Sequence, residues 1–313
     1  MKAIIVRDFT TGPRFETDFS TPTPTDNEAL IHVTASSLSN RARSGAMGAH
    51  YSSNGKLPMI PGVDGIGTLV DGQKVYFISE GSFAEEVAVP KGHWVPVPAG
   101  LDDAKLAGMM NPALSSWMAL KYRADFQPGQ KVMILGATGN AGALAVQIAH
   151  RMGASEVIAV ARNTQKLQAL TQLGATQLVD LSGDPETVKA DLAKAGSDVD
   201  IILDYLWGDV SANAMRAIIP NRHDDEQLLK WVEIGSSAGQ TAPIPGAAFR
   251  AVTLELIGSG QGSVAPKYIL QSLAEILAAE AETPFTFTIH QLPLSDFEEG
   301  WQDRGSGRIV FTM

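Results

Sequence analysis

The sequence predicts an α/β protein that contains a doubly wound parallel sheet of about six strands and a smaller β-rich part before it. From Lys131 onward, continuous apolar runs alternate with helical segments. Buried parallel strands have such continuous runs, and their alternation with helices implies crossover connections. Before residue 100, short β-branched runs are separated by glycine, proline, aspartate and asparagine. That pattern is typical of a small barrel or a curled antiparallel sheet.

The β-rich part opens the chain and ends near residue 102. Its expected strands lie in "KAIIVRD", "EALIHVTAS", "IGTLVDGQKVYFI" and "SFAEEVAVP". Residues 102–124 predict a helix, a break at Asn111-Pro112 and then a second helix, because proline removes a helical hydrogen bond. A turn is expected at "QPGQ", 127–130.

The parallel part follows this turn. Its expected strands lie in "KVMIL", "EVIAVA", "TQLVD", "VDIILDYL", "KWVEIG" and "VTLELIG". Helices are expected from Ala141 to Met152, in "TQKLQALTQLG" ending at Gly174, and in "SANAMRAII". The last stretch predicts an amphipathic helix in "SVAPKYILQSLAEILAAE" and two strands, "PFTFTIHQL" and "GRIVFTM", which we expect to return to the first part.

Composition excludes several functional classes. With 313 residues, 44% of them apolar, the chain is long enough for two domains with real cores. The formal net charge of −10 argues against a nucleic-acid surface and against binding to anionic membranes. No segment approaches the roughly 20 apolar residues that span a bilayer, and Arg7 and Asp8 interrupt the first apolar run, unlike a signal peptide. We therefore expect a soluble cytoplasmic protein.

Three glycines spaced three residues apart stand in "LGATGNAG", 135–142, between a strand and an apolar helix. This context contains Ala137-x-Gly139-x-x-Gly142, a dinucleotide fingerprint with alanine in the first slot. Gly139 would let backbone approach a pyrophosphate, Gly142 would let the helix pack on the sheet, and the helix N-terminus would attract phosphate. We expect cofactor contacts from Ala137, Thr138, Gly139, Asn140, Ala141 and Gly142; the alternative is a tight turn of small residues.

The end of the second parallel strand favours NADP over NAD. An NAD site usually has Asp or Glu there to bond the ribose 2′-hydroxyl, but the sequence has Ala161 followed by Arg162. A guanidinium binds a 2′-phosphate well, and Lys166 is one helical turn further on. Arg162, Asn163 and Lys166 are therefore predicted to bind NADPH; the alternative is that the two cations are solvated surface residues.

Order and spacing along nearly the whole chain resemble the medium-chain dehydrogenase/reductase superfamily, in its zinc-free quinone-oxidoreductase-like branch. The segments that carry the resemblance are "LPMIPGVDGIGTLVDGQKVYF", "GSFAEEVAVP", "NPALSSWMALKYRADFQPGQKVMILGATGNAG", "KWVEIGSSAG" and "LELIGSG". The resemblance implies a GroES-like β-barrel domain at 1–112, a Rossmann NADP-binding domain at 113–258, and a return to the barrel at 259–313. It also implies an active cleft between the domains, and homodimers that pair the strand at about 253–258.

The sequence departs from the zinc-dependent relatives at their ligand positions. Ser39, Asn40 and Val63 stand in the regions where those relatives carry a cysteine and a histidine, and the chain has no cysteine. The six histidines show no ligand spacing. We therefore expect no metal, and without a Lewis acid the site is unsuited to plain alcohol dehydrogenation. Quinones and α,β-unsaturated carbonyls remain suitable hydride acceptors, because the incoming charge delocalises to oxygen.

Three polar residues are candidates for contact with the acceptor or the nicotinamide side. Asn40 would donate to a carbonyl, Tyr51 would donate or relay a proton, and Ser115 stands where relatives carry a threonine beside the nicotinamide ribose. Alternatively, Asn40 caps a helix that begins at Arg41, and Tyr51 only anchors its loop. The tyrosine of many relatives would fall near Met47, so this loop is laid out differently.

Two late glycine turns are expected to reach the nicotinamide. "IGSSAG", 234–239, and "IGSG", 257–260, end buried strands at the carboxyl edge of the sheet, where ligands bind in open α/β sheets. Gly235, Ser236, Ser237, Gly258 and Ser259 are the expected contacts; the alternative is ordinary turns. Trp207 either shields the cofactor or belongs to the core or an interface.

Two functional classes fit these features. One is an NADPH-dependent, metal-independent quinone or enone oxidoreductase, and the other is an NADPH-binding sensor or scaffold of the same fold with little turnover. A short-chain reductase does not fit, because its glycine turn would come at the chain start and its Tyr-x-x-x-Lys pair is missing.

Overall fold

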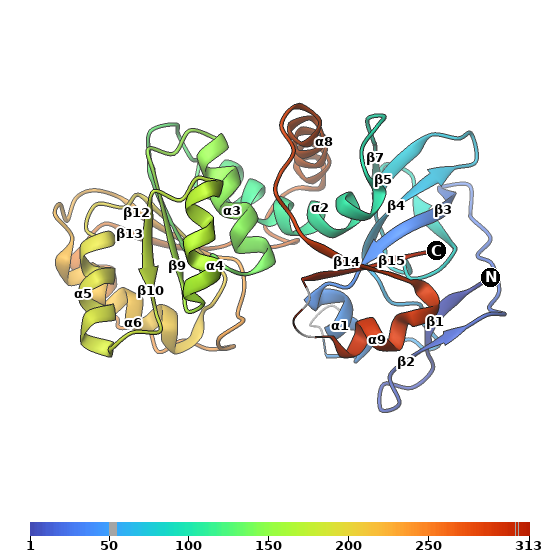
Figure 1. The fold of residues 1–313 in the computed structure, drawn as a ribbon, viewed down its shortest axis with the longest axis horizontal. Helices are drawn as coiled ribbons and strands as arrows, with labels where there is room; N and C mark the ends of the chain where they lie inside the picture. Colours follow the sequence, from blue (N-terminus) through green and yellow to red (C-terminus); the bar gives the residue numbers. More distant parts are fainter. Residues whose placement is uncertain (50–54, 304, 306) are drawn as a thin grey trace. The chain divides into compact units, whose positions relative to one another are not determined.

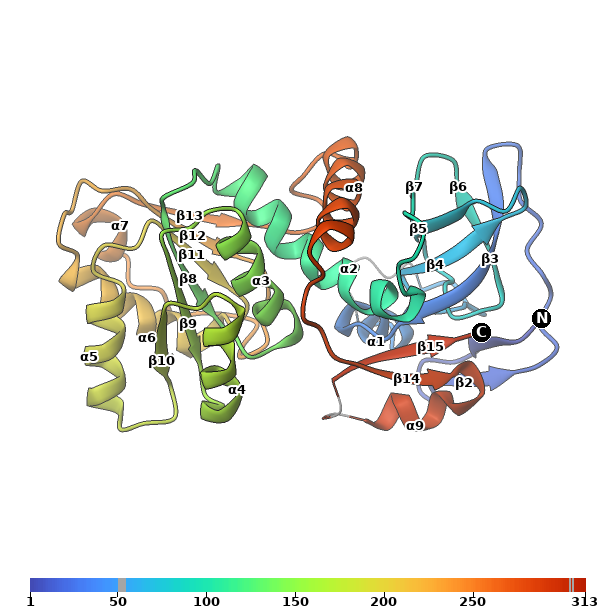
Figure 2. The same cartoon turned by 45° about the horizontal axis from the view of Figure 1, so that its top comes forward.

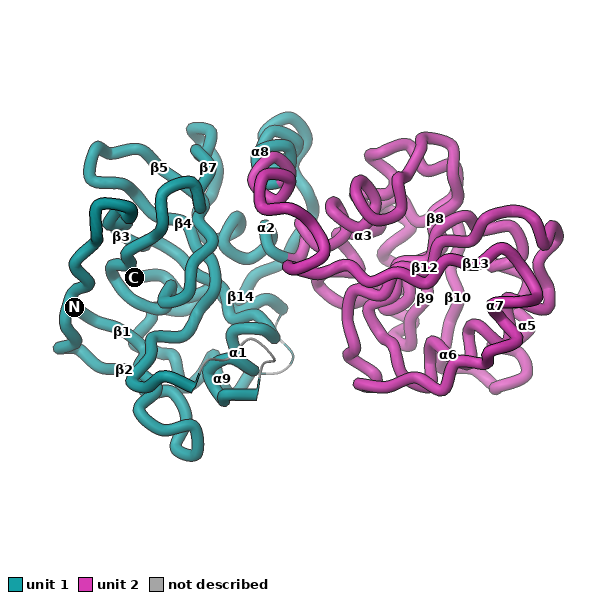
Figure 3. Tube along the Cα trace, turned by 180° about the vertical axis from the view of Figure 1, so that it is seen from behind, with its two compact units in different colours: residues 1–111, 273–313 teal, residues 112–272 magenta. Residues whose placement is uncertain are grey.

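The computed structural model describes residues 1–49, 55–303, 305 and 307–313. The chain forms two compact units, coloured separately in Figure 3. Unit 1 contains Met1–Asn111 and Leu273–Met313, and unit 2 contains Pro112–Ser272. Within the described ranges, no helix is both long and apolar enough to cross a membrane.

Unit 2 contains the predicted parallel sheet of six strands, which confirms the expected fold class. The strand order is β10-β9-β8-β11-β12-β13, and every neighbouring pair is parallel. The strands are β8 (Lys131–Leu135), β9 (Glu156–Ala161), β10 (Gln177–Asp180), β11 (Ile201–Asp204), β12 (Leu229–Glu233) and β13 (Leu254–Gly258). The chain moves outward from β8 to β10 and then returns to β11, so the order reverses between β8 and β11.

Helices cover both faces of this sheet, as Figures 1 and 2 show. On one face lie α3 (Asn140–Arg151) and α4 (Thr164–Ala169), and on the other α5 (Pro185–Ala195) and α6 (Gly208–Ile218). Short helical segments complete the unit: Leu170–Leu173, Ile219–Asn221 and α7 (Ala248–Ala251). The central strands have no exposed side chains, which explains their continuous apolar sequences.

One helix, α2 (Asp103–Met118), runs through Pro112, so the predicted break at Asn111-Pro112 is wrong. It continues into a π-helical turn, Ala119–Arg123. A proline inside a helix costs about 3 kcal/mol. Burial of the neighbouring apolar side chains offsets this cost. Four of them are at most 1% exposed: Leu106, Met109, Met110 and Ala113.

Unit 1 is built on a second, mostly antiparallel sheet with the order β14-β15-β3-β4-β5-β7, and β6 pairs with β3. Its strands are β3 (Glu28–Ser37), β4 (Asp64–Leu69), β5 (Lys74–Ile78), β6 (Glu86–Pro90), β7 (Trp94–Pro96), β14 (Ile289–Pro293) and β15 (Arg308–Thr312). A separate hairpin joins β1 (Ala3–Val6) to β2 (Pro13–Glu16). The helical segments are α1 (Asn40–Ala46), Leu294–Asp296 and α9 (Phe297–Gln302). Helix α8 (Pro266–Glu282) begins in unit 2 and belongs to unit 1 from Leu273 onward.

The C-terminal strands belong to unit 1. β15 pairs antiparallel with β3, and β14 pairs parallel with β15. Three aromatic rings, Phe83, Phe297 and Phe311, pack together in the core beside this sheet, with centroids 5.2–6.2 Å apart. The GroES-like part of the predicted fold is therefore formed by segments from both ends of the chain.

Candidate functional site

The glycine turn between β8 and α3 is held by backbone hydrogen bonds. The N–H groups of Gly136 and Ala137 both donate to Val160 O, at 2.9 and 3.1 Å. Gly136 has φ +89°, which favours glycine. Gly139 N–H donates to Gly136 O at 3.1 Å. Ala137 is buried, and its N–H is already hydrogen-bonded. The turn therefore keeps its conformation without a ligand.

Gly142 allows α3 to begin directly against this turn. A Cβ at Gly142 would lie 2.3 Å from Gly136 O and 2.7 Å from Ala137 Cα. Real Cβ atoms do not approach backbone so closely, so any larger residue would push the helix off the turn. The close approach of helix and turn requires glycine at this position.

The first turn of α3 offers free N–H groups at its exposed end. Asn140, Ala141 and Gly142 are the first helical residues, so their N–H groups have no acceptor within the helix. Gly139 and Asn140 are exposed, and Thr138 and Ala141 are partly exposed. No acidic residue stands in this first turn. The helix end therefore suits an anion such as a pyrophosphate.

The two predicted phosphate-binding cations follow β9, Arg162 directly after the strand and Lys166 in α4. Arg162 and Lys166 are exposed. Asn163 has a structural role that the sequence analysis did not assign: its side-chain oxygen accepts from Lys166 N–H at 2.9 Å and caps α4. This cap fixes the start of the helix that carries Lys166.

Asp180 is a neighbour of this position that sequence reasoning missed. It pairs with Ala161 in the β9–β10 register. Its Oδ1 accepts from Ser182 N–H and Oγ, and its Oδ2 accepts from Thr164 Oγ1 at 2.7 Å. These hydrogen bonds lower the pKa of Asp180, with Ser182 contributing first. Both oxygens are thus occupied by local donors.

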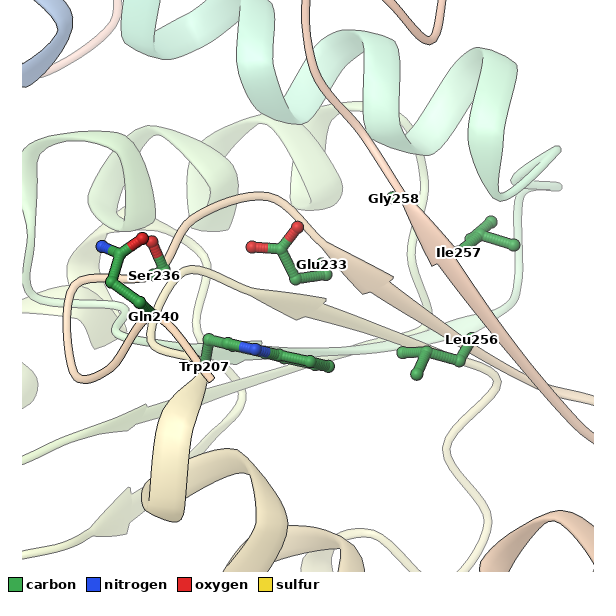
Figure 4. Close-up of a pocket in the computed structure, with 7 residues that line it drawn as sticks. All are labelled: Trp207, Glu233, Ser236, Gln240, Leu256, Ile257 and Gly258. Atoms are coloured by element: carbon green, nitrogen blue, oxygen red, sulfur yellow. The ribbon is translucent and has the colours of Figure 1, made fainter. Parts of the chain in front are cut away.

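A pocket of about 320 Å³ lies at the carboxyl ends of β12 and β13 (Figure 4). Seven residues line it: Trp207, Glu233, Ser236, Gln240, Leu256, Ile257 and Gly258. Two of the predicted nicotinamide contacts, Ser236 and Gly258, are therefore among its walls. Ser259 N–H donates to Glu233 O at 2.7 Å, and the buried Ser259 Oγ has no hydrogen-bond partner among the described residues.

Backbone hydrogen bonds join the loop after β11 to the loop after β12. Ser237 N–H and Ala238 N–H donate to the carbonyls of Tyr205 and Leu206, at 3.3 and 2.7 Å. Ser237 Oγ also donates to Tyr205 O at 2.7 Å. Ser237 therefore stabilises the loop through its side chain. These hydrogen bonds connect the pocket wall to the ends of both β11 and β12.

Trp207 has φ +55°, in the left-handed region, which is a genuine outlier for a bulky residue. Such strain costs about 1–3 kcal/mol and needs support from the surroundings. Asp204 supplies it. Its Oδ1 accepts from the N–H groups of Leu206 and Trp207, at 2.9 and 3.0 Å, and its Oδ2 accepts from Trp231 Nε1 at 2.9 Å.

Glu233 is a half-buried carboxylate in this pocket. Burial raises its pKa, and the nearby charge of Asp204 raises it further. The two residues pair in the β11–β12 register. An N–H or O–H donor in the pocket would stabilise the Glu233 carboxylate.

Comparison with known proteins agrees with this geometry. The family model for zinc-binding dehydrogenases matches residues 141–221. The quinone oxidoreductase of Thermus thermophilus, whose structure has also been solved with NADPH, is 26% identical; the match covers 100% of both chains with a TM-score of 0.82. These matches support the placement of the chain in the quinone-oxidoreductase-like branch of the medium-chain dehydrogenase/reductase superfamily.

Two curated relatives extend the comparison. The probable NADPH-dependent quinone reductase tdiC of Emericella nidulans is 27% identical over 99% of each chain. The NADPH-dependent alkenal/one oxidoreductase, chloroplastic, of Arabidopsis thaliana is 29% identical over 53% of this chain, which spans 48% of that relative.

Ser115 and Tyr205 lie together in unit 2. Ser115 Oγ donates to Pro112 O at 2.7 Å and lies 3.2 Å from Tyr205 Oη. Burial raises the pKa of Tyr205 to about 12. The Ser115 hydroxyl is thus already engaged, and Tyr205 is a neutral donor at neutral pH. Sequence reasoning had not singled out Tyr205.

The predicted acceptor contacts belong to unit 1, whereas the nucleotide-binding candidates belong to unit 2. Asn40 is exposed and is the first residue of α1. The cap of this helix is Ser39, whose Oγ accepts from Ala42 N–H at 2.9 Å, so the alternative in which Asn40 is the cap is wrong. The side chain of Asn40 is not needed for capping. Tyr51 lies outside the described residues.

Unit 1 also has a buried polar cluster around Asp64 that the sequence analysis missed. Asp64 is fully buried, and Tyr76 Oη donates to its Oδ2 at 2.7 Å. Burial raises the pKa of Asp64; the Tyr76 hydrogen bond and the Arg308 charge act in the opposite direction. Among the described side chains, no group of three or more His, Cys, Asp or Glu is placed to hold a metal ion.

The buried Asp64 predicts a pH-dependent effect on stability. A carboxyl group with a raised folded-state pKa makes the free energy of unfolding fall as pH rises above its ordinary value of 3.8. This loss amounts to about 1.4 kcal/mol for each unit of elevation. The Asp64→Asn variant should lack this loss, so its stability relative to wild type should increase between pH 4 and pH 7 in urea denaturation.

The exposed Asp71→Asn is the matched control for this experiment, because it also replaces one aspartate by asparagine but at a position that is not buried. Parallel stability curves for wild type and Asp64→Asn would contradict the raised pKa.

Proposed function

We propose that this protein is an NADPH-dependent oxidoreductase that reduces a quinone or an α,β-unsaturated carbonyl without a metal ion. The observation that carries the proposal is the fixed glycine turn at the start of α3, where Gly142 permits close packing and the free N–H groups face solvent. The names of the two curated relatives support the same cofactor and the same classes of acceptor.

Residues of unit 2 would hold the cofactor along the carboxyl edge of the sheet. The N–H groups of Asn140, Ala141 and Gly142 would bind the pyrophosphate, with Thr138 beside them. Arg162 and Lys166 would bind the 2′-phosphate through charge-assisted hydrogen bonds. The exposed positions of these two side chains leave them available for this contact.

When bound, NADPH supplies a hydride, and the acceptor takes up this hydride and one proton. Quinones and enones place the added charge on oxygen, so hydrogen-bond donors are sufficient to stabilise it. The exposed Asn40 side chain would provide such a donor from unit 1. Tyr51 remains the proposed proton donor or relay. The sequence contains no cysteine for a zinc site of the dehydrogenase type.

We assign nucleotide binding to the part of the chain at 113–258, and acceptor binding to the part at 1–112 with 259–313. We also propose that two copies pair through β13, which is the outermost strand of the parallel sheet. An outermost strand has unpaired backbone groups that a second copy can use.

The test of the proposed function is the cofactor preference of an Arg162→Ala/Lys166→Ala double variant. Wild type should bind NADPH about 100-fold more tightly than NADH, because two charge-assisted contacts are worth about 3 kcal/mol together. The double variant should bind both nucleotides with similar affinity. Calorimetry measures the affinities, and NADPH oxidation with 1,4-benzoquinone or an enal measures turnover.

Lys189→Ala, an exposed cation on α5, is the control and should keep the wild-type preference. Equal affinity of wild type for NADPH and NADH would refute the 2′-phosphate assignment. Tight NADPH binding with no turnover on quinones or enals would instead indicate a sensor or scaffold.

A further inference from the structure

The strained Trp207 and the half-buried Glu233 meet in the pocket at the ends of β12 and β13. Figure 4 shows the Glu233 carboxylate together with Ser236 and Gln240 on one side of the Trp207 indole, and Leu256 beyond the far end of the ring. Ile257 points away from this group. The pocket thus combines a flat aromatic surface with a hydrogen-bond acceptor.

More contacts hold the backbone at Trp207 than a tryptophan at the protein surface requires. The buried Asp204 fixes its backbone, and Gly208, with φ +68°, lies against the following loop. A Cβ at Gly208 would lie 3.0 Å from both Ala238 O and Gly239 Cα. Two adjoining loops are therefore packed so that this indole stays at the pocket wall.

Burial in the core does not explain the strain. Trp207 is only half-buried and does not belong to the hydrophobic cluster between the sheet and α6, whereas Trp231 does. Strained residues that gain no core packing are concentrated at ligand sites. The half-buried carboxylate of Glu233, beside the charge of Asp204, has no hydrogen-bond donor among the described residues, and a ligand could supply one.

We infer that Trp207 and Glu233 form a subsite for a flat unsaturated ring that carries an N–H or O–H donor. The ring stacks on the indole, and its donor bonds to the Glu233 carboxylate. The inference rests on the proposed function, because two groups of this chemistry would come to this edge of the sheet. One is the carboxamide-bearing ring of the nucleotide, and the other is an aromatic acceptor with a hydroxyl group.

Two matched pairs of probes distinguish these sources. For the nucleotide, calorimetry compares NADPH with 2′-phospho-ADP-ribose, which lacks the nicotinamide. For the acceptor, steady-state kinetics compare 4-hydroxycinnamaldehyde with 4-methoxycinnamaldehyde, which lacks the O–H donor. The variants are Glu233→Gln and Trp207→Gly. Glycine adopts the positive φ of residue 207 without strain, so this variant keeps the loop conformation.

In either the nucleotide comparison or the acceptor comparison, wild type should favour the probe that carries the donor, NADPH or 4-hydroxycinnamaldehyde, by about tenfold over its matched partner. Glu233→Gln should bring that ratio close to one, and Trp207→Gly should weaken binding of the ring-bearing probe about tenfold while 2′-phospho-ADP-ribose binds as before. The arm in which the ratio falls identifies the source of the ring.

Two controls alter equivalent features outside the pocket. Glu186→Gln removes an exposed carboxylate from α5, and Asp125→Gly relieves the other non-glycine positive φ of the described chain, +49°. Both should keep wild-type ratios. Unchanged ratios for Glu233→Gln and Trp207→Gly in both arms would overturn the subsite while leaving nucleotide binding intact. Absence of any nucleotide binding by wild type would overturn the proposed function, and with it this subsite.

Discussion

Replacing Gly142 by alanine is expected to lower the free energy of unfolding by about 3 kcal/mol and the Tm by about 5–10 °C. The added Cβ would lie 2.3 Å from Gly136 O, and this oxygen is a backbone atom of a hydrogen-bonded turn. The turn therefore cannot yield as a flexible side chain would. Thermal unfolding checks the stability, and calorimetry should show that NADPH binding is weakened along with it.

Gly139→Ala is the matched variant in the same turn. Its Cβ would lie 3.4 Å from Gly136 O, and its φ of −75° suits alanine. We expect a loss of about 1 kcal/mol and a Tm about 2–4 °C below wild type, since alanine is a poorer N-cap than glycine, together with weaker NADPH binding where the pyrophosphate approaches the backbone. Equal loss of stability in both variants would contradict the packing role assigned to Gly142.

Removing the Asp204 carboxylate is the second change with a large expected effect. In Asp204→Ala, the N–H groups of Leu206 and Trp207 and the indole N–H of Trp231 all lose their acceptor. Each buried unpaired donor costs about 1–3 kcal/mol, so we expect a total loss of about 4 kcal/mol. Urea denaturation measures this loss, and Trp207 should become more mobile in time-resolved fluorescence.

Asp204→Asn and Asp209→Ala distinguish the loss of a hydrogen-bond acceptor from the loss of an acidic residue in this region. Asparagine keeps one acceptor oxygen and should recover part of the stability. Asp209 is exposed in the first turn of α6, and its replacement should change the free energy of unfolding by less than about 1 kcal/mol. If Asp204→Ala proved as stable as Asp209→Ala, the loop after β11 would not depend on this carboxylate.

Much of the fold could be predicted because its signals are local. "KVMIL" and "EVIAVA" coincide with β8 and β9, since strands buried on both faces must be apolar throughout. The predicted break at Pro112 was wrong because the neighbouring side chains of α2, such as Met109 and Ala113, are fully buried, and the local sequence does not show this burial. At α1, two adjacent residues are both good caps, and the pattern does not say that Ser39 rather than Asn40 takes the position.

The site was less predictable because its special features are three-dimensional. No sequence rule places a tryptophan at φ +55°, and the conformation depends on the Asp204 carboxylate three residues earlier and on the loop after β12. The importance of Glu233 likewise depends on burial beside Asp204 from a neighbouring strand. The glycine turn was visible in the sequence because its requirements are largely local: Gly139 and Gly142 both lie close to Gly136 O, and Gly136 has a positive φ.

The pairing of β15 with β3 has a consequence for biosynthesis. The Arg308 guanidinium donates to Ser37 Oγ across 271 residues of chain, so the sheet of unit 1 stays incomplete until β15 has left the ribosome. Unit 2 is continuous and is synthesised before that point. Nascent chains should therefore acquire a protease-resistant unit 2 while β3 still lacks its partner β15, and loss of β15 would destabilise unit 1 more than unit 2.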